Sequence, residues 1–186
     1  MRRLSGKRIA ILATDGFEQS ELFEPRKALL EEGALVEIVA PHDGAIQGME
    51  HMIMGKTVPV DTLLANALPA HYDALVLPGG AHNPDALRID AHATAFVRSF
   101  FEDQKPVAAI CHAPWVLINA GVVKDRRLTS WPTIRQDLQN AGAEVVDEEV
   151  VVDGLLITSR GPKDLPAFCK SMIAVIAKPR FEAAAS

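Results

Sequence analysis

The sequence lacks the features that mark secreted, membrane or nucleic-acid-binding proteins. Two cysteines among 186 residues exclude a disulfide-dense scaffold. No apolar run approaches the roughly 18 residues of a membrane-spanning helix, and the first residues do not resemble a secretory signal. The 19 basic residues are outnumbered by 24 acidic ones, which argues against a basic nucleic-acid-binding surface. We therefore expect a cytoplasmic protein with neither a membrane nor a nucleic acid as its partner.

Apolar residues, in contrast, are plentiful. They make up 48% of the chain, enough to bury one core without disulfides or metal. Charged residues make up 23%, a mixture typical of a folded domain and not of a disordered chain. The length fits a single domain over residues 1–186, with a core of about residues 7–177 and a loose tail over 178–186.

Short apolar runs alternate with helical patterns along the chain. The predicted strands cover residues 7–13, 35–40, 72–77, 106–110, 127–130, 144–152 and 155–159. The predicted helices cover residues 17–32, 61–67, 90–104, 133–141 and 164–177, with another between Cys111 and Gly121. Glycines across residues 42–56 suggest a hairpin. The alternation predicts an α/β fold, a flavodoxin-like α/β/α sandwich with a mostly parallel sheet.

The most informative junction follows the predicted strand 106–110. Cys111 stands where that strand turns into a helix, the geometry of a nucleophile elbow. The N-terminus of a helix favours negative charge, so we expect the thiol pKa to lie below its ordinary value of about 8.5. A cysteine packed as a small apolar residue is the alternative. Its position at the end of a buried strand favours a reactive Cys111.

Gly79 and Gly80 follow another buried strand and have two interpretations. They form a simple turn, or their amides join the amide of His112 in an oxyanion hole that stabilises a carbonyl under attack by sulfur. No G-x-G-x-x-G motif follows a strand, which argues against a dinucleotide site. Metal-ligand spacing is also missing. We expect neither a cofactor nor a metal.

Other polar residues are candidates for supporting roles. Glu18 is either a solvated carboxylate at a helix start or a protonated acid that donates a hydrogen bond to the sulfur. His112 is adjacent to the thiol, while His82 is a second candidate base or a plain surface residue. Asp85 could orient either imidazole. Cys169 lies on an apolar helical face and is predicted to belong to the core.

Several motifs, in order, resemble the DJ-1/PfpI superfamily, and within it the branch called intracellular protease I or general stress protein. The resemblance is collinear from about residue 7 to residue 176. It rests on DGFEQSEL at residues 15–22, ALVLPGG at 74–80, VAAICH at 107–112, and LTS, NAGA, EVVVDG and TSR farther along the chain.

The resemblance implies a role for each matching residue. Cys111 would be the nucleophile, and Glu18 the acid that hydrogen-bonds to its sulfur. The amides of Gly80 and His112 would form the oxyanion hole, and His112 would complete a protease-like dyad. In oligomeric relatives an acidic residue of a neighbouring subunit assists that histidine, and Asp85 resembles it. The chain departs from many relatives in having Ala113 instead of glycine after Cys-His and a longer loop over residues 81–85.

Three functions are consistent with these residues. The first is a stress-response enzyme that attacks reactive carbonyls through Cys111, of the glutathione-independent glyoxalase or deglycase type. The second is an intracellular cysteine peptidase, which also needs a proton for the leaving amine and an extended groove. The third is a redox sensor or chaperone with an oxidisable Cys111. The resemblance further implies a homodimer or a larger homo-oligomer.

Overall fold

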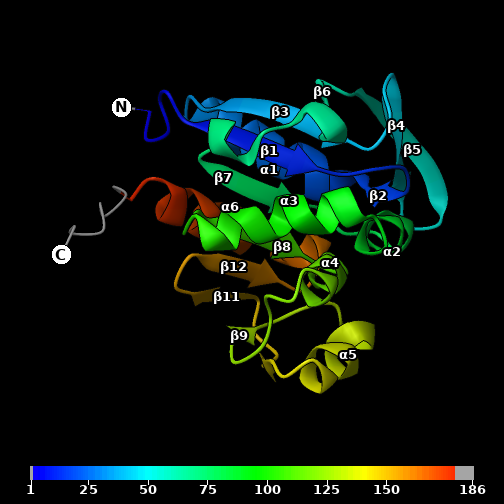
Figure 1. Ribbon diagram of the computed structural model, residues 1–186, viewed down its shortest axis with the longest axis vertical. Helices are drawn as coiled ribbons and strands as arrows, with labels where there is room; N and C mark the ends of the chain where they lie inside the picture. The colour runs from blue at the N-terminus through cyan, green and yellow to red at the C-terminus, as the bar shows by residue number, and fades with distance from the viewer. Residues whose placement is uncertain (1, 179–186) are drawn as a thin grey trace.

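The computed structural model describes residues 2–178. Its main sheet has seven strands in the order β11-β12-β8-β7-β1-β3-β6 (Figure 1). These strands are β1 (Arg8–Leu12), β3 (Leu35–Ala40), β6 (Thr62–Leu63), β7 (Ala74–Leu77), β8 (Val107–Ile110), β11 (Val150–Asp153) and β12 (Leu156–Ser159). Neighbouring strands are parallel except for β11, which runs antiparallel to β12 at one edge. The mostly parallel sheet is therefore confirmed.

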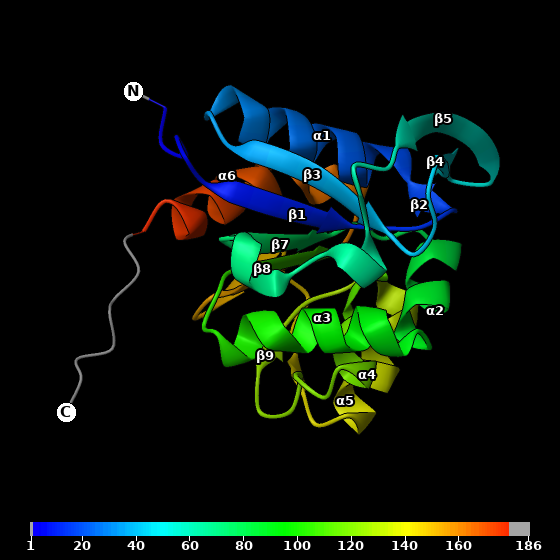
Figure 2. The ribbon, with the colours of Figure 1, turned by 45° about the horizontal axis from the view of Figure 1, so that its top comes forward.

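Helices cover both faces of this sheet, as Figure 2 shows most clearly. One face carries α1 (Gln19–Glu31) and α6 (Leu165–Ile176), and the other carries α2 (His82–Arg88), α3 (Ala91–Glu102), α4 (Pro114–Asn119) and α5 (Arg135–Asn140). Side chains of β1 alternate between the two cores: Ile9 packs on the α1 side and Ala10 on the α3 side. A strand buried on both faces reads as a continuous apolar run, which explains why the sequence predicts it well.

Two small sheets complete the fold. One consists of β2 (Phe17–Glu18), β4 (Ala45–Glu50) and β5 (Ile53–Pro59), and the other of β9 (Arg127–Leu128) and β10 (Glu144–Val145). Short 3-10 turns are η1 (Leu64–Asn66), η2 (Pro69–His71), η3 (Pro132–Ile134) and η4 (Pro162–Asp164). The antiparallel pair β4–β5 confirms the predicted hairpin. Within residues 2–178, every helix is too short or too polar to cross a bilayer.

Some predicted elements differ from the structure. The helix expected from residue 17 starts at Gln19, because residues 17 and 18 pair with β4 as a strand. The helix predicted for residues 61–67 is instead β6 and η1, and α2 was not predicted. The predicted strand 144–152 is divided into β10 and β11, which belong to different sheets. Residues 179–186 of the predicted tail lie outside the described residues.

Candidate active site

Cys111 directly follows β8 in a strained backbone conformation. Its φ is +64°, in the left-handed region that costs a residue other than glycine about 1–3 kcal/mol. Backbone hydrogen bonds hold it there: its N–H donates to the Ser159 carbonyl at 3.0 Å, and its carbonyl accepts from the Trp131 N–H at 2.9 Å. The sharp turn predicted at the end of this strand is present. It fixes the position of the sulfur.

Two backbone amides face the sulfur. The N–H groups of Gly80 and His112 donate hydrogen bonds to Cys111, and each favours the thiolate. Gly80 has a φ of +85°, and a Cβ there would collide with the Gly16 carbonyl oxygen and the Glu18 amide, so this turn requires glycine. This is the pair of donors expected for an oxyanion hole, and that role remains a prediction.

The carboxyl group beside the thiol belongs to Glu21, which corrects the contact expected of Glu18. Glu21 is fully buried, and its Oε2 accepts a hydrogen bond from the Gly79 N–H at 2.8 Å. A Cβ added to Gly79 would lie 2.5 Å from that Oε2 and 2.6 Å from Cβ of Cys111, so both side chains flank this glycine. Glu18 ends β2, where its Oε2 accepts from the His51 N–H at 3.0 Å.

A signal in the sequence could have identified Glu21. The buried residues of α1 are Glu21, Leu22, Pro25 and Leu29, so Glu21 shares the inner face of the helix with Pro25 and Leu29 at four-residue spacing. An acidic residue on an apolar helical face indicates a group buried for a reason. Oε1 of Glu21 is buried without a hydrogen-bond partner among the described residues. Burial raises the pKa of this carboxyl to about 8.

The expected lowering of the Cys111 pKa is contradicted by the structure. Cys111 is only 6% exposed, and this burial raises the pKa of the thiol despite the two amide donors. The helix that follows, α4, is six residues long and starts at Pro114, so its dipole is small. The direction of this shift favours the protonated thiol, so attack through the sulfur calls for a base.

His112 is placed to act as that base. Its Nδ1 lies 3.2 Å from Sγ of Cys111, and its Nε2 lies 3.3 Å from the hydroxyl oxygen of Thr133. Two indoles lie near the ring: its centroid is 5.3 Å from that of Trp115 and 5.9 Å from that of Trp131. Burial lowers the pKa of His112, which keeps the imidazole neutral near pH 7 and able to accept a proton.

Two other predicted residues lie away from this cluster. Asp85 is exposed in the first turn of α2, and within residues 2–178 its carboxylate makes no hydrogen bond with His112. A contact from the Asp85 of a neighbouring subunit remains a prediction. His82 is exposed at the start of α2, where it packs against Gly16. Within residues 2–178, neither residue makes a hydrogen bond with Cys111 or His112.

The second cysteine differs from the first. Cys169 lies half-buried on α6 against the core, as predicted, and burial raises its pKa to about 11. In the part of the chain that the structure describes, no three His, Cys, Asp or Glu side chains are grouped to hold a metal ion. The chemistry of this region is thus that of one thiol, one imidazole and one carboxyl.

The chain is similar to known proteins over nearly its whole length. The sequence model of the DJ-1/PfpI family matches residues 7–175. Over 169 residues the chain is 45% identical to Deglycase TK1284 of Thermococcus kodakarensis, covering 91% of this chain and 99% of that one. It is 42% identical over 175 residues to General stress protein 18 of Bacillus subtilis, covering 93% and 99%. The crystal structure of Drosophila melanogaster DJ-1beta is similar with a TM-score of 0.83 and 30% identity, covering 94% and 91%.

Proposed function

Because the chain belongs to the DJ-1/PfpI family, we propose that it is a stress-response enzyme that attacks reactive carbonyls with Cys111, of the glutathione-independent glyoxalase or deglycase type. The names of the similar deglycase and general stress protein support this class of activity. One observation carries the proposal: the thiol lies between a neutral proton acceptor, His112, and a neutral proton donor, Glu21, below two amide donors.

Addition to an aldehyde or ketone needs only these groups. Nδ1 of His112 takes the thiol proton, and the sulfur forms a bond to the carbonyl carbon while the carbonyl π bond breaks. The oxygen receives the electron pair, and the amides of Gly80 and His112 are placed to stabilise its negative charge. The imidazolium then returns the proton to that oxygen, which gives a neutral hemithioacetal.

Glu21 contributes through its protonated form. Its pKa of about 8 keeps the carboxyl mostly neutral at pH 7, so it can donate a hydrogen bond to the sulfur while the thiolate exists. A charged carboxylate at the same place would repel the thiolate. Burial of Glu21 without a cationic partner is therefore what makes the residue useful.

The test is consumption of methylglyoxal by the purified protein without glutathione. We expect turnover by the wild-type chain and by Cys169→Ala, and loss of turnover to background in Cys111→Ala. Cys169 is the matched control because it is a half-buried thiol outside the cluster. Equal turnover by the Cys111→Ala protein would contradict the proposal.

A cysteine peptidase is the second candidate, and the 3.2 Å contact between Sγ of Cys111 and Nδ1 of His112 favours it. A peptidase uses such a dyad to activate the thiol and then to protonate the leaving amine. Fluorogenic peptide cleavage that co-elutes with the protein and is lost in Cys111→Ser would support this function. The redox-sensor hypothesis is less favoured, since burial and a raised thiol pKa both slow oxidation.

A further inference from the structure

We propose that Thr133 is a positioning residue that holds His112 in the tautomer able to accept the Cys111 proton at Nδ1. This inference rests on the proposed function, in which His112 is the base. It adds a group within the same chain that selects the protonation state of the ring. Neither the motifs of the sequence nor the expected role of Asp85 indicates Thr133.

The first step of the argument is the chemistry of a neutral imidazole. One ring nitrogen carries a hydrogen and donates, while the other carries a lone pair and accepts. Nδ1 faces the Cys111 sulfur at 3.2 Å, and Nε2 faces the Thr133 hydroxyl at 3.3 Å. If Nε2–H donates to Thr133, Nδ1 is left as the acceptor for the thiol hydrogen.

The second step concerns the hydroxyl itself. Thr133 is exposed, so its hydrogen can point to water while its oxygen accepts from Nε2–H. The same arrangement suits the ring after proton transfer: the imidazolium then donates through Nδ1 to the thiolate and through Nε2 to Thr133. One hydroxyl thus favours the tautomer needed before the transfer and the charged ring formed by it.

The third step is that the ring and Thr133 are held by one segment. Trp131 is stacked on His112 with an angle of 27° between the ring planes, and its N–H donates to the Cys111 carbonyl. Thr133 lies two residues later in η3. The hydroxyl and the stacked ring therefore approach His112 as a unit, which fixes the distance between Nε2 and the hydroxyl oxygen.

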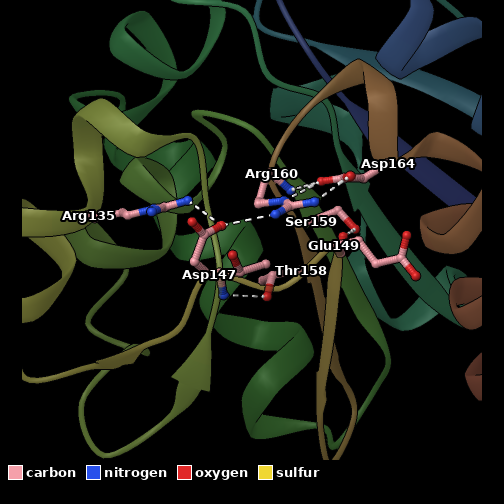
Figure 3. A network of polar contacts seen from close by, with 8 residues as sticks. Arg135, Asp147, Glu149, Thr158, Ser159, Arg160 and Asp164 are labelled. Carbon is pink, nitrogen blue, oxygen red and sulfur yellow. Dashed lines mark hydrogen bonds and ion pairs between the residues drawn. The ribbon is translucent and has the colours of Figure 1, made fainter.

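The fourth step is the attachment of this segment to the sheet. Figure 3 shows Asp147 between two arginines: it accepts from Arg135 at 2.7 Å and from Arg160 at 3.0 Å. Arg135 follows η3 closely, and Arg160 directly follows Ser159, whose carbonyl accepts from the Cys111 amide. The ion pairs thus join the segment that carries Thr133 to the strand end that holds Cys111.

The test compares Thr133→Val, which keeps the shape and removes the hydroxyl, with Thr133→Ser, which keeps the hydroxyl. The readout is the ¹⁵N NMR signature of His112 in the resting protein at neutral pH. We expect a protonated Nε2 and an unprotonated Nδ1 in the wild type and in Thr133→Ser. In Thr133→Val the equilibrium should shift toward the other tautomer by roughly five- to tenfold, the effect of one hydrogen bond. Thr57→Val is the matched control, because Thr57 is an exposed threonine on β5.

Kinetics provide the second readout. Because fewer molecules hold the reactive tautomer, kcat for methylglyoxal should fall in Thr133→Val with little change in KM, and Thr133→Ser should restore it. The fall in kcat should equal the fall in the population of the reactive tautomer measured by NMR. An unchanged tautomer in Thr133→Val, or the same shift produced by Asp85→Asn, would overturn the inference. If the valine variant does not fold, Thr133→Ala replaces it in both measurements. Since the tautomer is measured without substrate, this outcome is separate from the Cys111→Ala result that tests the proposed function.

Discussion

Two polar clusters adjoin the end of β12, and their acidic groups differ in whether they are ionised. In the network of Figure 3, Asp147 bridges two arginines, and Arg160 also donates to both carboxylate oxygens of Asp164 at 2.8 and 2.9 Å. Hydrogen bonds from Arg135 and Arg160 hold the pKa of Asp147 below its usual range. In the thiol cluster, burial raises the pKa of both Glu21 and Cys111.

The difference lies in the partners rather than in the residue types. Opposite charges stabilise the ionised forms in the network, so its carboxylates and arginines stay charged near neutral pH. The thiol cluster holds acids without cations, so its groups stay neutral and can exchange protons with one another. The first arrangement suits stability and the second suits catalysis. Substitutions in either cluster test this difference.

The largest effect is expected from Glu21→Gln. The amide keeps the size of the side chain, but its N–H donates a weaker hydrogen bond to the thiolate than a carboxylic acid does. Methylglyoxal turnover should therefore fall by about tenfold or more, the effect of weakening a hydrogen bond to a charged group. The measurement is kcat/KM without glutathione. Glu24→Gln, at an exposed position on the same helix, should keep wild-type turnover. Equal turnover by both variants would show that Glu21 does not take part in the reaction.

The same substitution should change how stability depends on pH. The pKa of Glu21 is raised on folding from 4.5 to about 8, so the folded chain keeps a proton that the unfolded chain has released. This bound proton stabilises the folded chain fully below pH 4.5, and the stabilisation is lost as the pH rises toward 8. Urea unfolding across this range should show a falling free energy in the wild type and in Glu24→Gln. A parallel fall in Glu21→Gln would mean that another group is responsible.

The fold could be predicted because its central strands are buried on both faces. The runs at residues 8–12, 74–77 and 107–110 are almost wholly apolar, and this pattern can be recognised without knowing which segments pack against them. Cys111 could be found for the same reason, since it directly follows one of these runs. The amides of Gly80 and His112 also followed from positions beside strand ends.

The rest of the site depends on contacts between distant segments. Choosing between Glu18 and Glu21 required the point where β2 ends and α1 begins, which pairing with β4 decides. The direction of the thiol pKa required its burial, which only the packed structure gives. Thr133 lies 21 residues from His112 in the chain and reaches it through tertiary packing.

In the ion-pair network, Asp164→Asn tests how much a buried, paired carboxylate contributes to stability. The Asp164 side chain is 8% exposed and accepts from Nε and Nη2 of Arg160. An amide offers one acceptor oxygen and no charge, so one donor of Arg160 loses its partner. We expect a loss of about 1–3 kcal/mol in the free energy of unfolding, measured with urea at neutral pH. A change no larger than that of Asp125→Asn, at an exposed position, would contradict this assignment.

The smallest effect is expected from Asp147→Asn, and its sign with pH is the opposite of that for Glu21. The Asp147 side chain is 59% exposed, so water and salt screen its ion pairs. Because its pKa is lowered on folding, its contribution is present above the ordinary value of 3.8 and is lost as the pH falls through the folded value. Urea midpoints of the wild type and Asp147→Asn should therefore differ slightly at neutral pH and converge in acid. If the wild type instead became more stable than Asp147→Asn in acid, the ionised carboxylate of Asp147 would be destabilising the folded chain. Asp147 would then not be stabilised by its two arginines, as the comparison of the two clusters requires.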